Sequence, residues 1–237
     1  MNTETNKPNV LAVIFDMDGV IVDSEPIHVE AFKIFMDELD VTYTESFLHS
    51  FIGFSIKDNV TKINNELLRG REIDISEGVL RRDAIYLDLI KRSKLKPLPG
   101  VFEVIDYCQS VDLPLALASS SIGEQVDVIL DRLTDHRINF NTLFSSIVHG
   151  DHVENRKPAP DIYQLSAKNL GLPARNCITI EDSNAGVAAA KNAGIRCIAL
   201  KNQYIPEEKL KHANFVIGHM REAIPIIEQL RKGNENE

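Results

Sequence analysis

Acidic side chains stand directly behind a short apolar run near the N-terminus. In the segment FDMDGVIVDS, which begins at Phe15, Asp16 and Asp18 lie two residues apart and a glycine follows them. Two carboxylates at this spacing can bind a cation, or one can attack an electrophile while the other moves a proton. A calcium loop of the EF-hand type is excluded, because Val20 and Ile21 stand where that loop needs an oxygen ligand and a glycine.

Polar residues also follow two later apolar runs. Ser119 and Ser120 come after LPLALA, Glu181 and Asp182 come at the end of CITI, and Lys157 lies in a loop between these runs, in KPAPD. The carboxyl ends of parallel strands share the crevice in which α/β sheets bind ligands, so we expect these groups to converge. Clustered carboxylates repel one another, and with oxygen ligands alone the ion that best relieves the repulsion is Mg²⁺. Serine hydroxyls, helix amides and a lysine opposite such an ion would suit a phosphoryl group.

The apolar runs predict the strands of a sheet. Each is of strand length and apolar throughout, as in strands that helices cover on both faces. The predicted strands are 10–15, 113–118, 145–148, 177–180, 197–200 and 215–217. Helical patterns alternate with them at 123–133, 161–170 and 184–192, the last closed by Gly194, and Ser121 with Glu124 fits a capping box for the first. This alternation predicts an α/β protein with a doubly wound, Rossmann-like parallel sheet.

One interval interrupts the alternation. Between about residues 24 and 96 only helical patterns occur, such as PIHVEAFKIFMDEL and GVLRRDAIYLDLIKR. We therefore expect a helical domain over 24–96, inserted after the first strand of a core formed by 1–23 and 97–237. Ser24–Glu25 and Pro97–Gly100 are its expected hinges.

Composition limits the partners of the protein. A formal charge of −9 and a pI near 5.3 disfavour nucleic acid. The polar start MNTETNKPN carries no signal core, and no apolar run is long enough to span a membrane, so we expect a cytoplasmic protein. We also expect a monomer. The three cysteines are widely spaced in apolar surroundings and are expected to be reduced core residues: Cys108, Cys177 and Cys197.

Four segments in this order, FDMDGVIVDS, ALASSS, KPAPDIY and EDSNAG, resemble the motifs of the haloacid dehalogenase superfamily of phosphotransferases. The helical insertion resembles the cap of the branch that contains β-phosphoglucomutase and sugar-phosphate phosphatases. The resemblance covers nearly the whole chain, and four ordered motifs are far more specific than one. It implies an α/β core with a helical cap, Mg²⁺ as cofactor and a small phosphorylated metabolite as substrate.

The resemblance also implies roles for individual residues. Asp16 matches the nucleophile that becomes an aspartyl phosphate, and Asp18 matches the general acid and base. Gly19 matches the glycine at which the chain turns away towards the cap. True dehalogenases lack an acid at the position of Asp18, so its presence favours phosphoryl transfer. The implied metal ligands are Asp16, Asp18 through its backbone carbonyl, Glu181 and Asp182, and the implied phosphate-binding residues are Ser119, Ser120 and Lys157.

The helical insertion bears on the choice between phosphatase and mutase. β-Phosphoglucomutase has an arginine where this chain has Ile56, which disfavours a mutase and favours hydrolysis. Three residues are candidates for substrate binding in the cap: His28, Lys57 and Arg82. Mutase activity remains the main alternative. A non-catalytic binding module of the same fold is less favoured because all four motif groups are present, and a nucleotide-dependent oxidoreductase is disfavoured because GxGxxG is absent after the first strand.

Overall fold

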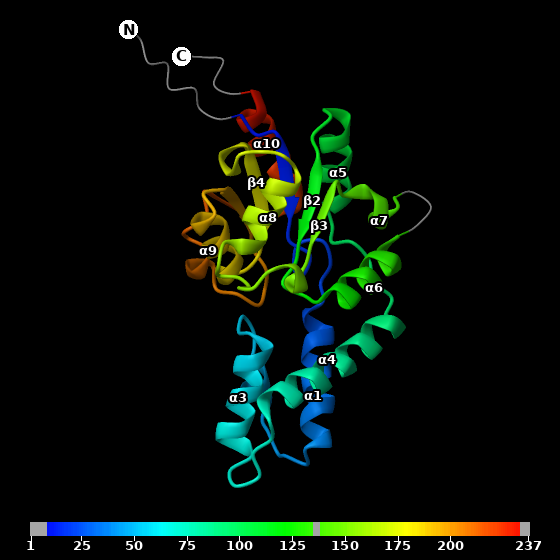
Figure 1. Ribbon diagram of the computed structural model, residues 1–237, viewed down its shortest axis with the longest axis vertical. Helices are drawn as coiled ribbons and strands as arrows, with labels where there is room; N and C mark the ends of the chain where they lie inside the picture. The colour runs from blue at the N-terminus through cyan, green and yellow to red at the C-terminus, as the bar shows by residue number, and fades with distance from the viewer. Residues whose placement is uncertain (1–8, 135–137, 233–237) are drawn as a thin grey trace. The chain divides into compact units, whose positions relative to one another are not determined.

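The computed structural model describes residues 9–134 and 138–232 (Figure 1). The chain divides into two compact units, Met1–Asp23 with Lys96–Glu237, and Ser24–Leu95. The helical unit ends at Leu95, one residue before its expected end at residue 96. Residues 1–8, on which the expectation of no targeting segment mainly rests, lie outside the described residues.

The first unit contains a parallel sheet of six strands in the order β3-β2-β1-β4-β5-β6. This confirms the predicted α/β fold class. β1 lies at the centre and pairs with β2 on one side and β4 on the other, with Val13 opposite both Leu115 and Ile178. The strands are β1 Ala12–Phe15, β2 Leu115–Ala118, β3 Ser146–Val148, β4 Cys177–Glu181, β5 Arg196–Leu200 and β6 Phe215–Ile217.

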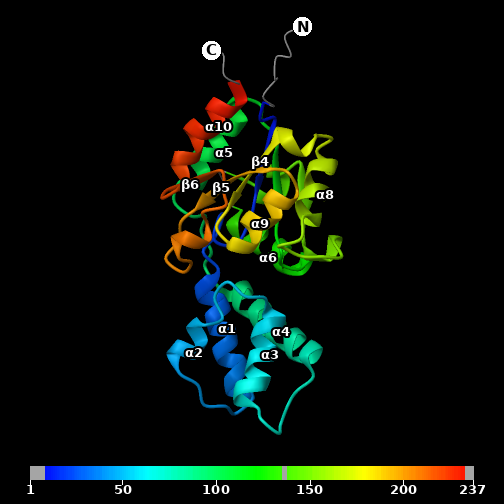
Figure 2. The same ribbon diagram turned by 90° about the vertical axis from the view of Figure 1, so that its left-hand side faces the viewer.

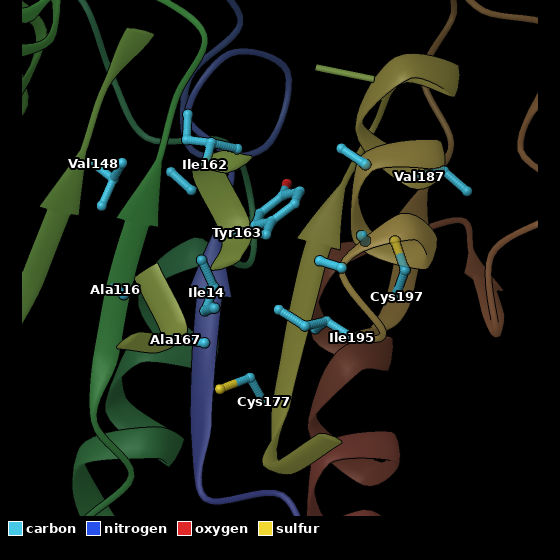
Figure 3. Packing of buried hydrophobic residues seen from close by; sticks show 14 of the residues in the cluster. Ile14, Ala116, Val148, Ile162, Tyr163, Ala167, Cys177, Val187, Ile195 and Cys197 are labelled. Atoms are coloured by element: carbon cyan, nitrogen blue, oxygen red, sulfur yellow. The ribbon is translucent and has the colours of Figure 1, made fainter. Parts of the chain in front are cut away.

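Helices cover both faces of this sheet, which explains why its central strands β1, β2 and β4 are buried along their whole length. α5 (Val101–Ser110) and α10 (Ala223–Lys232) lie on one face, and α8 (Asp161–Asn169) and α9 (Asn184–Asn192) lie on the other (Figure 2). Figure 3 shows the face of the sheet that α8 and α9 cover, where side chains of these helices pack on those of the strands. Residues labelled there include Ile14, Ala116, Val148, Ile162, Tyr163, Ala167, Cys177, Val187 and Cys197.

The helix after β2 begins differently from the prediction. α6 covers Gly123–Leu133 as predicted, but its N-cap is Ile122, which offers no side-chain cap, so the capping box of Ser121 with Glu124 is wrong. The Ser121 hydroxyl instead donates to Asp18 Oδ2 at 3.0 Å. A carboxylate 28 residues away in the chain satisfies the first helix amide, because Gly123 N–H donates to Asp151 Oδ2 at 2.7 Å.

Short helical turns complete the first unit: α7 Phe140–Leu143, η1 Gly150–His152, η2 Ala174–Asn176, η3 Glu207–Lys209 and η4 Met220–Glu222. The three cysteines are buried and free, as predicted. Within the described part of the chain, no helix combines the length and the apolar character that crossing a membrane requires.

The second unit contains four helices in its described residues: α1 Glu25–Glu38, α2 Glu45–His49, α3 Ile56–Leu67 and α4 Ile75–Arg92. The N-cap residues of the last three helices are Thr44, Ser55 and Asp74. The side chain of each accepts a hydrogen bond from a backbone N–H of the first turn. A buried polar contact fixes the connection between α3 and α4. Asn64 donates to Ile73 O at 2.8 Å and accepts from Ile73 N–H at 3.2 Å.

Asn64→Ala should therefore destabilise the protein by about 1–3 kcal/mol, because it leaves the backbone groups of Ile73 without their partner. Asn65→Ala is the matched control, since Asn65 is exposed on the same helix and gains the same helix propensity. Urea unfolding followed by far-ultraviolet circular dichroism measures both variants. Equal stability of the two variants would contradict the assigned role of Asn64.

Candidate active site

The polar residues after β1, β2 and β4 meet where the sheet reverses its direction of winding. β1 ends at Phe15 and its neighbour β4 ends at Glu181, so Asp16 and Glu181 stand at the carboxyl ends of adjacent strands. The Asp16 N–H donates to Ile180 O at 3.0 Å, which continues the ladder and fixes the backbone of Asp16. This edge between oppositely wound halves is where open α/β sheets bind ligands.

Lys157 connects these carboxylates. Its Nζ donates to Asp16 Oδ1 at 2.7 Å, to Glu181 Oε1 at 2.6 Å and to Ala118 O at 3.0 Å. Its side chain is only 5% exposed, so the ammonium exchanges water for three protein acceptors. The ends of β1, β2 and β4 thus share one cation, and the structure brings together residues that lie far apart in the sequence.

Burial and charge act strongly on the protonation of this cluster. Burial, aided by the charge of Glu181, raises the pKa of Asp16 to about 8, although Lys157 acts in the opposite direction. Burial also raises the pKa of Asp182, and the charges of Asp16 and Glu181 add to that rise. Burial alone would lower the pKa of Lys157, but the two carboxylates outweigh it and raise that pKa, so the ammonium stays charged.

Glu181 is surrounded by hydrogen-bond donors. Its Oε1 accepts from Lys157 and from the Tyr163 hydroxyl, and its Oε2 accepts from Asp182 N–H at 3.1 Å and from the Ser183 hydroxyl at 3.1 Å. Burial and the Glu181 charge raise the pKa of Tyr163, which keeps the phenol protonated as a donor. Gly186 leaves room for this carboxylate, since a Cβ there would lie within 2.0 Å of three Glu181 atoms.

Three carboxylates could hold a metal ion together. Asp16, Glu181 and Asp182 each offer an oxygen, and these atoms all lie within 4.8 Å of one another. The Asp18 carboxylate is outside this group. Its Oδ2 accepts from the Ser121 hydroxyl at 3.0 Å and lies 3.5 Å from the Ser119 hydroxyl.

The predicted phosphate-binding serines lie on the loop after β2. Ser119 is fully buried, and its Oγ accepts from Ser121 N–H at 3.1 Å. Ser120 lies between them and is partly exposed. Next to it, the Ser121 hydroxyl contacts Asp18. The sequence did not predict this contact, because the same hydroxyl was expected to cap the following helix.

Two helices, α8 and α9, hold the loop that carries Lys157. Asn192, the last residue of α9, donates to Pro158 O at 3.1 Å. At the start of α8, the Asp161 carboxylate accepts from the side chain of Asn155 at 3.1 Å. These contacts place the lysine without using its own charge.

A tight turn follows Asp18. Ile21 N–H and Val22 N–H both donate to Met17 O, and Gly19 has a positive φ of 74°. A Cβ on Gly19 would lie 1.8 Å from Asp182 Oδ2, so glycine is required by its backbone conformation and by the carboxylate packed against it.

The three candidates of the helical unit occupy different environments. Arg82 is fully buried, faces His28 Nδ1, pairs with Asp83 at 3.1 Å and lies over the rings of Phe32 and Tyr86. Burial and the Arg82 charge lower the pKa of His28, so this imidazole stays neutral. The guanidinium of Arg82 thus has its partners inside the helical unit. The third candidate, Lys57, is exposed in the first turn of α3.

The raised pKa of Asp16 predicts a pH dependence in the absence of metal ions. The folded protein keeps a proton on Asp16 up to about pH 8, whereas the unfolded chain releases it near pH 4, so unfolding becomes easier as the pH rises between these values. Asp16→Asn should remove this contribution. We expect the variant to gain stability relative to the wild type between pH 5 and pH 8, on the order of a few kcal/mol.

Urea unfolding in EDTA at both pH values measures the difference. A stability difference between variant and wild type that does not change with pH would show that Asp16 does not titrate in this range.

Gly19→Ala should displace the Asp182 carboxylate in addition to straining the turn. Gly194→Ala is the matched control, because Gly194 has a similar φ of 72° but nothing lies within 4 Å of its added Cβ. We expect both variants to lose about 1 kcal/mol or more of stability, and only Gly19→Ala to lose Mg²⁺ affinity, measured by calorimetric titration. Unchanged Mg²⁺ affinity in Gly19→Ala would contradict the close approach.

Comparisons with known proteins identify the family. Residues 13–200 match the model of the family described as haloacid dehalogenase-like hydrolase. The chain is 35% identical over 188 residues to the phosphorylated carbohydrates phosphatase of Thermotoga maritima, covering 79% of this chain and 83% of that protein. It is 28% identical to the probable pseudouridine-5'-phosphatase of Drosophila melanogaster, covering 90% of each chain.

A solved structure shares the fold. The putative β-phosphoglucomutase from Thermotoga maritima is 28% identical and superposes with a TM-score of 0.72, covering 92% of this chain and 98% of that one. The chain belongs to the family of haloacid dehalogenase-like hydrolases.

Proposed function

We propose that the protein is a Mg²⁺-dependent phosphatase that hydrolyses a small phosphate monoester, with a sugar phosphate as the favoured substrate. The reaction passes through an intermediate in which Asp16 is phosphorylated. The observation that carries the proposal is the contact of Asp16 Oδ1 with Lys157 Nζ at 2.7 Å, beside Glu181 and Asp182, with Asp18 two residues further along. A nucleophile, a proton carrier and a cation for phosphate oxygens thus come from one edge of the sheet.

The substrate class rests on the relatives. Two of them are named for phosphorylated carbohydrates and for pseudouridine 5'-phosphate, which are both phosphate monoesters on a sugar. A negatively charged protein needs local positive charge to bind such an anion. Lys157 supplies it in the cluster, and a bound cation would add to it.

The residues at this edge fit a magnesium ion. The grouped atoms are oxygens, and the described residues offer no histidine or cysteine to this group. Burial and mutual repulsion raise the pKa values of Asp16 and Asp182 in the metal-free protein, and a divalent cation beside them would relieve that repulsion. Asp16 and Asp182 would hold it, with Glu181 beside them, while the resemblance adds the carbonyl of Asp18. When bound, the ion would neutralise negative charge that develops on the transferring group.

Hydrolysis then proceeds in two displacements at phosphorus. An oxygen of Asp16 attacks, the bond to the sugar oxygen breaks, and Asp18 gives its proton to that leaving oxygen. Water next attacks the same phosphorus and gives a proton to Asp18, which releases phosphate and restores Asp16. Hydrogen bonding by Ser121 holds the Asp18 carboxylate in place for both proton transfers.

The phosphate oxygens need donors that remain fixed through both steps. Lys157 stays oriented by Glu181 and by Ala118 O, so only its third N–H, which contacts Asp16 here, has to turn to the phosphoryl group. Ser119, buried directly after β2, is the hydroxyl donor that the family resemblance assigns to the phosphate. Hydrolysis is favoured over isomerisation because α3 begins with the uncharged Ile56, which offers nothing to a second phosphate.

Asp16→Asn should reduce Mg²⁺-dependent release of phosphate from p-nitrophenyl phosphate and from sugar phosphates by about a thousandfold or more, because the amide cannot form the intermediate. Asp127→Asn, an exposed acid on α6, is the matched control and should keep full activity. The assay reads free phosphate and isomerised sugar together. A folded Asp16→Asn variant with wild-type turnover would contradict the proposal, and isomerised sugar as the main product would replace the phosphatase by a mutase.

A further inference from the structure

Asn202 lies outside all the segments that carry the family resemblance, yet its side chain reaches the acidic cluster. It follows β5 by two residues, whereas Asp182 follows β4 directly. β4 and β5 are neighbours in the sheet, with Glu181 opposite Ala199, so the loops after the two strands lie next to each other. Asn202 is partly buried there.

The amide of Asn202 donates to Asp182 twice. Its Nδ2 lies 2.9 Å from Asp182 Oδ2 and 3.3 Å from Asp182 O. The first is a hydrogen bond to a carboxylate, a stronger kind than one between neutral groups. The side chain and the backbone of Asp182 are therefore tied to the same nitrogen.

The orientation of this amide is fixed by its other end. Asn202 Oδ1 accepts from Tyr204 N–H and from Ile205 N–H, both at 2.8 Å. An amide turned by 180° would direct its NH₂ group at two backbone donors and its oxygen at a carboxylate, which would lose all of these contacts. The nitrogen is thus held towards Asp182.

Asp182 is confined from a second side as well. Its Oδ2 is packed against Gly19, where a Cβ would come within 1.8 Å. Gly19 and Asn202 together leave this carboxylate little freedom to rotate, although it belongs to the group of oxygens that could hold a metal ion. Partners that orient a metal ligand in this way commonly account for a 10–100-fold effect on metal affinity or activity.

We propose that Asn202 is a positioning residue that holds Asp182 in its metal-binding orientation. This inference rests on the proposed function, because it concerns the same cation site. Asn202→Ala should weaken Mg²⁺ binding, measured by calorimetric titration, by about tenfold or more. The concentration of Mg²⁺ that gives half-maximal phosphatase activity should rise in parallel, whereas KM for p-nitrophenyl phosphate at saturating Mg²⁺ should change by less than about twofold.

Asn214→Ala is the matched control. Asn214 Oδ1 accepts from Cys197 N–H at 2.8 Å, so this variant also removes an asparagine side chain that binds backbone next to β5, but at the strand's other end. It should lose stability with no more than about a twofold change in Mg²⁺ affinity. Mg²⁺ affinity in Asn202→Ala within about twofold of the wild type would overturn the inference, as would an equal loss in Asn214→Ala.

Asn202→Asp separates the positioning role from a role in loop folding. When ionised it keeps an oxygen for Tyr204 N–H and Ile205 N–H but has no hydrogen to donate to Asp182, so kcat at saturating Mg²⁺, measured at a pH where the new carboxyl is ionised, should fall by about tenfold or more. A wild-type kcat in this variant would overturn the inference, and this measurement remains decisive even where Asn202→Ala does not fold. A wild-type protein that neither binds Mg²⁺ nor releases phosphate would instead overturn the proposed function.

Discussion

The buried ammonium of Lys157 holds the site together. Adjacent parallel strands deliver Asp16 and Glu181 to the same edge of the sheet, where their charges repel each other in a region with little water. Lys157 contacts both carboxylates and is itself shielded from solvent. Lys157 alone cannot balance Asp16, Glu181 and Asp182 when all three are ionised, so without a metal ion Asp16 keeps its proton, and a divalent ion would allow all three to ionise together.

The surrounding structure keeps this charged cluster fixed. Tyr163 shares Oε1 of Glu181 with Lys157 and Ser183 donates to Oε2, so the carboxylate is oriented as well as charge-balanced. Gly19 and Asn202 confine Asp182 from two sides. Such a network is stable because its members are hydrogen-bonded, whereas a partly satisfied one would be costly to bury. The fold therefore contributes preorganisation, the property that electrostatic catalysis of phosphoryl transfer requires.

The sequence predicted the elements well where the signal is local. The helices 123–133 and 184–192 have the predicted bounds, and turn residues mark those of the second, which Ser183 caps at its start and Gly194 follows at its end. The first strand begins two residues later than predicted, at Ala12, since an apolar run does not show where pairing starts. The Ser121 capping box failed because the helix is capped one residue later, at Ile122, and the Ser121 hydroxyl donates to the distant acid Asp18 instead. Asn202 gave no signal, since its partner Asp182 is 20 residues away and only the pairing of β4 with β5 brings them together.

Phosphorylation of Asp16 during turnover is the event that the proposed mechanism requires above all others. It can be detected by rapid acid quenching of the enzyme with Mg²⁺ and a sugar phosphate, followed by mass spectrometry of its peptides. We expect a mass gain of one phosphoryl group on the peptide that contains Asp16, absent from Asp16→Asn and lost on treatment with hydroxylamine. Turnover without a phosphorylated enzyme, or with the phosphoryl group on another residue, would contradict the mechanism.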